Sequence, residues 1–149
     1  MKGRNAFLCS AVWASIGHSV AAVVGASFGS ARRPLVICGD GSFHITATAL
    51  STMVQFRRNP IVVVLANRIY GFEQFLLDAS FFNNPANAPK PYVALNVWNF
   101  AGFAKGLGVQ FAQNVDTPAA LDGGACRRQG VQRAELIAAQ VDALACRPR

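Results

Sequence analysis

Two apolar runs joined by a helical pattern constrain the fold of this chain more than any other feature. The first run, residues 35–38, ends at a Gly-Asp-Gly-Ser turn at residues 39–42. The second run, residues 61–65, is rich in β-branched side chains, and apolar residues recur at helical intervals over residues 43–56 between them. Continuous apolar runs are typical of strands buried on both faces. The sequence therefore predicts a strand, a crossover helix and a second strand, within an α/β fold whose parallel sheet is sandwiched by helices.

The residues that follow the two strands are predicted to meet. A helix of about fifteen residues carries the chain roughly 20 Å, and a strand of about six residues brings it back a similar distance. Asp40 and Asn67 therefore lie side by side at the carboxyl ends of adjacent strands, where open α/β sheets bind ligands. Their oxygens suit Mg²⁺ or Ca²⁺, and the N–H groups of Gly41, Ser42 and Phe43 favour an anion. This pattern predicts a phosphate ligand bridged by a metal ion.

The same residues resemble the signature of a known enzyme family. The GDG triplet, the strands on either side of the helix and Asn67 are similar to the motif of the thiamine diphosphate enzymes. The resemblance implies that Asp40, Asn67 and the main-chain carbonyl of Ile69 hold Mg²⁺ on the diphosphate of the cofactor. The residues implied to surround that diphosphate are Gly39, Gly41 and Ser42.

Further segments narrow the resemblance to the pyruvate and indolepyruvate decarboxylases. In WASIGHSV, Ile16 would hold the cofactor bent and the carbonyl of Ala14 would meet its aminopyrimidine. In GFEQF, Glu73 stands where these enzymes carry a catalytic glutamate, and segment 90–100, KPYVALNVWNF, also resembles that branch. The implied fold is the thiamine diphosphate-binding fold. The implied reaction is non-oxidative decarboxylation of a 2-oxo acid, of the pyruvate, indolepyruvate or phenylpyruvate type, to an aldehyde and CO₂.

The chain departs from the family pattern at three positions. Ala14 and Ile69 stand where the family has glycine, and Ala66 stands where it has asparagine. Because a backbone conformation open to glycine is strained for a β-branched residue, we expect strain at Ile69. Two other functions stay open. One is a fragment of an acetolactate synthase-like carboligase, which we expect to lack Glu73 and segment 90–100, and the other is a non-catalytic orphan domain.

The extent of the chain predicts one diphosphate- and magnesium-binding domain over residues 1–149, incomplete at its N-terminus and with an atypical tail from about residue 117. Because the family places a pyrimidine-binding domain ahead of this one, we expect such a domain of the same or another chain as a partner. A homo-oligomer and a 2-oxo acid substrate are expected in the full enzyme, and this chain alone is expected to be inactive. The ending ALACRPR favours a truncated or frameshifted coding sequence.

Composition argues against several other classes of protein. The net charge of +7 comes from scattered arginines without interleaved aromatic residues, which disfavours nucleic-acid binding. The four cysteines form no C-x-x-C pair, so free thiols and a cytoplasmic location are expected. Residues 5–31 lack charged side chains but contain many serines and glycines, which favours a buried helix over a membrane span or export signal. Small residues at 17, 21, 25 and 29 predict a ridge for close helix packing.

The second half of the chain predicts a long loop followed by helices and strands. Prolines 85, 89 and 91 mark the loop. The further predicted elements are a helix at 97–107, an edge strand at 109–112, a helix capped by Thr117 and interrupted by Gly123 and Gly124, and a last strand at 135–141.

Overall fold

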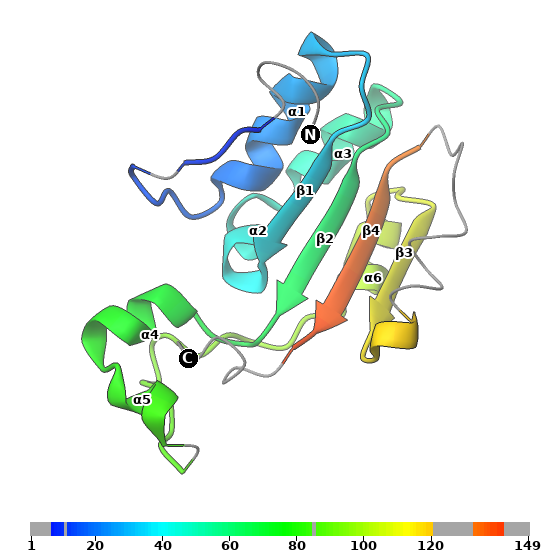
Figure 1. Cartoon of the computed structure of the whole chain (residues 1–149). Coiled ribbons are helices and arrows are strands. Elements are labelled where there is room, and N and C mark those ends of the chain that lie inside the picture. The colour runs from blue at the N-terminus through cyan, green and yellow to red at the C-terminus, as the bar shows by residue number, and fades with distance from the viewer. Residues whose placement is uncertain (1–6, 11, 85, 121–132, 142–149) are drawn as a thin grey trace.

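A parallel sheet organises the computed structural model, which describes residues 7–10, 12–84, 86–120 and 133–141 (Figure 1). The sheet has four strands in the order β1-β2-β4-β3, and every neighbouring pair is parallel. The strands are β1 (Leu35–Gly39), β2 (Ile61–Ala66), β3 (Phe111–Val115) and β4 (Glu135–Gln140). The helices are α1 (His18–Gly29), α2 (Asp40–Thr46), α3 (Ala49–Gln55), α4 (Gly71–Leu77), α5 (Ser80–Asn83) and α6 (Phe100–Gly106). The predicted α/β class is confirmed.

The predicted βαβ unit is present. β1 pairs with β2 in parallel, with Gly39 opposite Leu65, so the residues that follow the two strands reach the same edge of the sheet. The crossover is divided into α2 and α3 at Ala47 and Thr48, which keep helical dihedral angles. Hydrogen bonds there span three residues, as from the Leu50 N–H to the Ala47 carbonyl, and this tightening separates the two helices.

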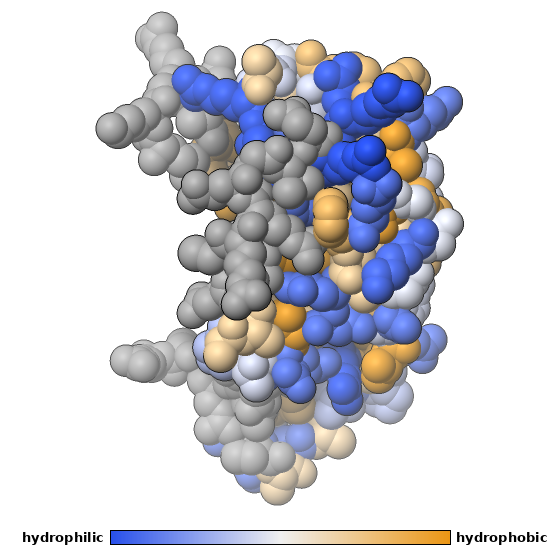
Figure 2. All heavy atoms as spheres, turned by 90° about the vertical axis from the view of Figure 1, so that its right-hand side faces the viewer, coloured by the Kyte–Doolittle hydropathy of each residue, from blue (hydrophilic) through white to orange (hydrophobic). Residues whose placement is uncertain are grey.

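One face of the sheet carries the main core. Inward-facing strand residues such as Val36 and Val62 pack with Phe43 of α2 and with residues of α1, α3 and α6. On the other face, Leu35 and Ile37 expose 61% and 60% of their surface. The prediction that the first strand is buried on both faces is therefore wrong for the described residues, because an apolar run does not reveal what covers its second face. Seen from the β3 side, the most hydrophilic side chains gather toward the upper end, where the strands begin (Figure 2).

Helix α1 lies in the segment predicted to form a buried helix, but it packs through a different face. Val20, Val23 and Ser27 are its buried residues. Gly25 and Gly29 are exposed, and no atom lies within 4 Å of a Cβ built on either one. The predicted packing ridge is therefore wrong at 25 and 29, whereas Gly17, just ahead of α1, does pack closely, because a Cβ built on it would lie 2.8 Å from Ile45. Among the described residues, no helix combines the length and the apolar character needed to cross a membrane.

Helices α4 and α5 form a small lobe beyond the carboxyl end of β2 (Figure 1). Ile69, Phe81, Phe82 and Val93 make an apolar core of its own. The predicted loop is therefore partly helical, because two adjacent phenylalanines pack inward and fix a helical turn.

The later elements follow the prediction with shifted bounds. Helix α6 starts at Phe100 rather than at residue 97, because the Asn99 Oδ1 accepts the Gly102 N–H at 2.9 Å and caps the helix there. β3 is an edge strand as predicted, although it covers 111–115, and β4 matches the last predicted strand. Thr117 Oγ1 accepts the Ala120 N–H at 3.2 Å, as its predicted capping role requires. The predicted break at residues 123 and 124 lies outside the described part of the chain.

Candidate functional site at the carboxyl edge of the sheet

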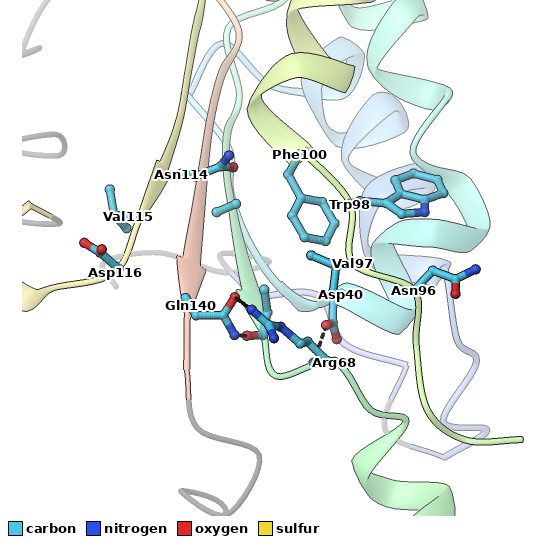
Figure 3. A pocket seen from close by; sticks show the side chains of 12 residues that line it. Asp40, Arg68, Asn96, Val97, Trp98, Phe100, Asn114, Val115, Asp116 and Gln140 are labelled. Carbon is cyan, nitrogen blue, oxygen red and sulfur yellow. Dashed lines mark hydrogen bonds between the residues drawn. The ribbon is translucent and has the colours of Figure 1, made fainter. Parts of the chain in front are cut away.

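The loops that follow β1 and β2 meet at the carboxyl edge of the sheet, as predicted. Asp40 directly follows β1 and is the first residue of α2. Its Oδ2 accepts a hydrogen bond of 2.7 Å from the backbone N–H of Arg68, in the loop after β2 (Figure 3). Its Oδ1 accepts the Gly41 N–H at 3.0 Å. The Asp40 side chain therefore ties the two loops together.

Asp40 is a buried carboxylate. It is 2% exposed, and no lysine or arginine in the described ranges forms an ion pair with it. Burial raises the pKa of the Asp40 carboxyl, and the hydrogen bonds from the N–H groups of Arg68 and Gly41 oppose that rise. A buried negative charge is unfavourable unless a positive charge compensates it. A divalent cation would supply that charge.

Asn67 opens a turn in the loop after β2. Its Oδ1 accepts the Ile69 N–H at 3.3 Å, which is the pattern of an Asx turn and leaves the amide oxygen a second lone pair. Arg68, between them, has a left-handed backbone with a φ of 64°, whereas Ile69 is not among the described residues with positive φ. The prediction of strain at Ile69 is therefore wrong, because the left-handed conformation falls one residue earlier.

The carbonyl of Ile69, a buried residue, is the third predicted metal ligand. The backbone groups on either side of this carbonyl form hydrogen bonds: the Tyr70 N–H donates to the Val93 carbonyl, and the Leu95 N–H donates to the Arg68 carbonyl. No donor within the described ranges bonds the Ile69 carbonyl oxygen. Those ranges also contain no group of three or more His, Cys, Asp and Glu that could hold a metal. A carboxylate, an amide oxygen and a backbone carbonyl fit Mg²⁺, which takes few protein ligands and completes its shell with phosphate and water.

Tyr70 joins the lobe to the turn after β1. A Cβ built on Gly41 would lie 2.4 Å from Cε1 of the Tyr70 ring, so this close contact requires glycine. Tyr70 directly precedes α4, whose first turn contains Glu73. Glu73 is half-buried, and no hydrogen bond or ion pair from a described residue engages its carboxylate. The Tyr70 contact therefore fixes the helix that carries Glu73 next to the Asp40 turn.

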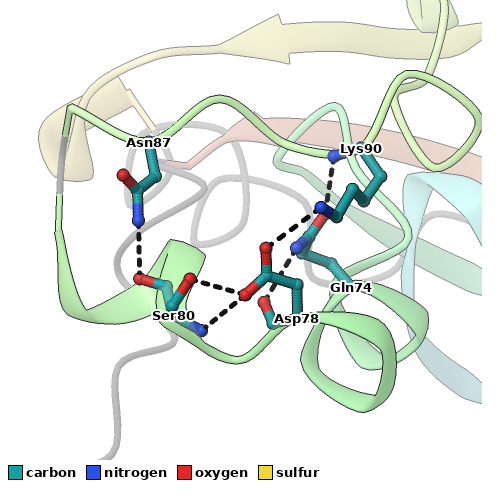
Figure 4. Close-up of polar contacts among 5 residues, drawn as sticks. All are labelled: Gln74, Asp78, Ser80, Asn87 and Lys90. Atoms are coloured by element: carbon teal, nitrogen blue, oxygen red, sulfur yellow. Dashed lines mark hydrogen bonds and ion pairs between the residues drawn. The ribbon is translucent and has the colours of Figure 1, made fainter.

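A buried glutamine stiffens the same helix. Gln74 is fully buried, its Nε2 donates to the Asp78 carbonyl at 2.9 Å, and its Oε1 accepts the Lys90 N–H at 2.8 Å (Figure 4). Asp78 also forms an ion pair of 3.3 Å with Lys90. The Ser80 hydroxyl and then Lys90, through their hydrogen bonds, lower the pKa of the Asp78 carboxyl. These contacts hold the proline-containing loop against α4, beside Glu73.

The segment that contains Ala14 and Ile16 docks on α2. The Gly17 N–H donates to the Ser42 hydroxyl at 2.9 Å, and the Thr46 hydroxyl donates to the Gly17 carbonyl at 2.7 Å. Ala14 has a φ of 46°, the left-handed conformation that suits the glycine of the family pattern. Ile16 and Gly39 are exposed. The structure thus brings the two predicted cofactor segments together through Ser42, and the roles of these residues toward cofactor and metal stay predictions.

A cavity of about 380 Å³ opens beside Asp40, toward β4 and β3 (Figure 3). Trp98 and Phe100 form an apolar part of its lining. The Arg68 guanidinium donates to Gln140 Oε1 at 3.4 Å, and Gln140 Nε2 donates to the Ala66 carbonyl at 2.7 Å. Of the residues predicted to contact the cofactor or the metal, Asp40 lines this cavity and the others do not. The sequence prediction missed Arg68 and Gln140, although each stands at or just after the carboxyl end of an apolar strand, where ligand contacts are expected.

Comparisons with known proteins point to one family. Residues 1–129 match the family described as thiamine pyrophosphate enzyme, C-terminal TPP binding domain, thiamine pyrophosphate being another name for thiamine diphosphate. Pyruvate decarboxylase of Aspergillus terreus is 41% identical over 69 residues, which cover 44% of this chain and 12% of that protein. The thiamine metabolism regulatory protein THI3 of Saccharomyces cerevisiae is 27% identical over 115 residues, which cover 68% of this chain and 17% of that protein. This chain therefore spans a small part of the length of these relatives.

A solved structure has the same fold. The thiamine diphosphate-dependent 4-hydroxybenzoylformate decarboxylase of Rhodococcus jostii RHA1 superposes with a TM-score of 0.72 and 24% sequence identity. The match covers 85% of this chain and 23% of that one. It confirms the predicted fold of the cofactor-binding domain.

Proposed function

This chain belongs to the thiamine pyrophosphate enzymes and carries their C-terminal cofactor-binding domain, and from that premise we propose that it is the cofactor-binding portion of a 2-oxo acid decarboxylase. The proposed reaction converts a 2-oxo acid of the pyruvate, indolepyruvate or phenylpyruvate type to an aldehyde and CO₂ without oxidation. The proposed cofactors are thiamine diphosphate and Mg²⁺. The identity shared with a pyruvate decarboxylase supports this class of reaction.

The observation that carries the proposal is the buried carboxylate of Asp40 beside the loop of Asn67 and Ile69. Asp40, the Asn67 amide oxygen and the Ile69 carbonyl would hold Mg²⁺ against the diphosphate. The bound ion would compensate the charge that burial makes unfavourable in the free protein. Binding of the metal and cofactor would therefore stabilise the charged form of the Asp40 side chain at this edge.

Glu73 is the proposed group for proton transfer. When bound, thiamine diphosphate supplies the electron sink for breaking the bond between the carboxylate and the carbonyl carbon of the substrate. Glu73 lies on a helix fixed to the Asp40 turn through Tyr70, and its carboxylate has no described partner that would have to be displaced. Its presence, together with segment 90–100, favours a decarboxylase over a carboligase of the acetolactate synthase kind.

The exposed apolar surface of the lobe supports a pyrimidine-binding domain, of the same or another chain, as the proposed partner. Phe72 and Leu76, four residues apart on α4, expose 61% and 67% of their surface. Exposed apolar side chains on one face of a helix are typical of a protein interface. A homo-oligomer that covers it is part of the proposal, and so is inactivity of this chain by itself.

Calorimetric titration of the whole chain with thiamine diphosphate and Mg²⁺ tests the proposal. We expect binding that requires Mg²⁺ and is lost in Asp40→Ala. Asp116→Ala removes an exposed carboxylate that lines the same cavity but is not a predicted metal ligand, and it should weaken binding far less than Asp40→Ala. Absence of binding, even after a pyrimidine-binding domain of a pyruvate decarboxylase is added, would refute the proposed site.

A second candidate function is a domain that binds the cofactor without catalysis. Two observations favour it: Ala14 holds a left-handed backbone where the family pattern has glycine, and one relative is named a thiamine metabolism regulatory protein. Adding the pyrimidine-binding domain and measuring CO₂ and aldehyde from pyruvate, indolepyruvate and phenylpyruvate separates the two functions. Binding of the cofactor without product from any of these acids would favour the second.

A further inference from the structure

The two ends of the sheet differ in charge. Described basic residues at the amino-terminal end, where the strands begin, are Arg32, Arg33, Arg57, Arg58, Lys105 and Arg133. The described acidic residues Asp40, Glu73, Asp78 and Asp116 lie at the opposite end or in the lobe beyond it. Glu135 is the described acid at the amino-terminal end, and it is nearly buried and already paired with Arg33, with 3.0 Å between Oε1 and Nη2. The strongly hydrophilic upper end in Figure 2 is therefore an electropositive end.

A cavity of about 510 Å³ opens at this electropositive end. It lies between the segment that ends α3 and the segments that lead into β3 and β4. Three arginines, Arg57, Arg58 and Arg133, line it, and no acidic residue is among its described lining. Val54, Val109 and Ala134 provide an apolar wall. A volume of this size lies within the usual range for small-molecule sites, and it exceeds what a single inorganic ion needs.

The backbone at Arg57 is unusual for an arginine. The Arg57 N–H donates to the Val54 carbonyl at 3.1 Å, and the Arg58 N–H donates to the Met53 carbonyl at 2.8 Å, which together form a Schellman motif after α3. Glycine is the usual residue at the left-handed position of this motif, but here it is Arg57, with a φ of 51°. An arginine within the last turn could interact with the helix dipole without this strain. Because Arg57 lies just outside the helix, its side chain lines the cavity instead.

The Arg58 and Arg133 side chains have donors to offer. The Arg58 guanidinium stacks over the Phe28 ring, with its carbon 4.0 Å from the ring centroid, and no described acceptor bonds its buried Nε. Arg133 is exposed, and its carbonyl accepts a bond of 3.2 Å from Arg33 Nη2, which fixes its backbone. Planar guanidinium groups bind phosphate oxygens in pairs of parallel hydrogen bonds.

We propose that this cavity, lined by Arg57, Arg58 and Arg133 and distinct from the cofactor site, binds a small organic polyphosphate such as a nucleoside diphosphate. Three guanidinium groups match the charge of a diphosphate near neutral pH, and the apolar wall suits the organic part of the molecule. The site lies at the opposite end of the sheet from Asp40. A test that refutes the proposed catalytic function would therefore leave this proposal unaffected, and the reverse also holds.

Calorimetric titration of the whole chain with ADP, with inorganic tripolyphosphate and with citrate tests the proposal. We expect ADP and tripolyphosphate to bind, with citrate weaker than either. Arg57→Gly should weaken ADP binding about tenfold or more, because it removes a charge-assisted contact. The variant should melt no lower than the wild type, since glycine suits the left-handed backbone, so misfolding would not explain the loss.

Two controls separate the site from its surroundings. Lys105→Ala removes one positive charge at the same end of the molecule but outside the cavity lining, and it should change ADP affinity less than about twofold. Asp40→Ala should leave ADP binding unchanged, because the polyphosphate would not occupy the cofactor site. Equal losses in Arg57→Gly and Lys105→Ala, loss in Asp40→Ala, tighter binding of citrate, or no binding of ADP would each overturn the proposal.

Discussion

The contact between Gly41 and the Tyr70 ring makes a sharp prediction for the substitution Gly41→Ala. The added Cβ would lie 2.4 Å and 2.6 Å from Cε1 and Cδ1 of the ring, whereas ordinary contact begins at 3.4 Å. The ring would have to retreat by about 1 Å, although Tyr70 packs on the apolar core of the lobe and its N–H is bonded to Val93. We therefore expect the variant to be strained.

The sign of the effect follows from two opposing contributions. Overpacking of this kind destabilises by about 1 to 3 kcal/mol. Alanine at a position with helical backbone, such as the start of α2, stabilises by about 0.4 to 1 kcal/mol relative to glycine, because it restricts the unfolded chain. Gly41→Ala should therefore lower the free energy of unfolding by about 0.5 to 2 kcal/mol. In a Tyr70→Ala background the clash is absent, so the same substitution should raise it by about 0.4 to 1 kcal/mol.

Urea unfolding followed by circular dichroism measures all four members of this double-mutant cycle. The expected coupling energy between the two sites is about 1 to 3 kcal/mol. Gly106→Ala in α6 is the matched control, because no atom lies within 4 Å of a Cβ built there, and it should stabilise equally in both backgrounds. If Gly41→Ala destabilises equally with and without the Tyr70 ring, the close contact does not explain why glycine follows Asp40.

Two further predictions concern Asp40 and Ala14. Affinity for thiamine diphosphate with Mg²⁺ should fall as the pH falls through the raised pKa of Asp40, since protonation removes the charge that attracts the metal, and calorimetry over a pH series measures this. The free energy of unfolding of the cofactor-free protein should change in the opposite direction. Measured relative to Asp40→Asn, it should rise as the pH falls over the same interval, because a carboxyl whose pKa is raised in the folded state binds more protons when folded. Ala14→Gly should raise stability by about 0.5 to 1 kcal/mol in thermal unfolding, because it relieves a left-handed alanine, whereas Ala21→Gly on the exposed side of α1 should lower it by a similar amount. A pH-independent affinity, or equal effects at positions 14 and 21, would contradict these expectations.

The sequence was sufficient for the part of the site that depends on strand and helix periodicity. Asp40 and the loop that begins at Asn67 are joined by a hydrogen bond because β1 and β2 are parallel neighbours, and that pairing follows from two apolar runs and the helix between them. The edge position of β3 was likewise predicted, because a short, weakly apolar run is typical of an edge.

The sequence was not sufficient where packing partners decide the outcome. The apolar pattern of Leu35 and Ile37 gave no sign that their face of the sheet is open among the described residues. The glycines at 25 and 29 recur at helical spacing, but the face of α1 that packs is set by Val20 and Val23. Left-handed conformations at Arg57 and Arg68 were also missed, because nothing in a single sequence marks an arginine that adopts the conformation of glycine.

The energetics at Asp40 explain why a buried carboxylate at this edge points to binding rather than to folding. Two backbone N–H groups stabilise it, but burial still raises its pKa, so the folded, unliganded protein bears its charge at a net disadvantage. An asparagine could accept one of the two hydrogen bonds and would carry no charge. A metal cation beside the carboxylate would offset the cost of burying its charge, and the oxygens of Asn67 and Ile69 are the neutral ligands that such a cation would still need. Stability and affinity should therefore respond in opposite directions to the ionisation of this one side chain.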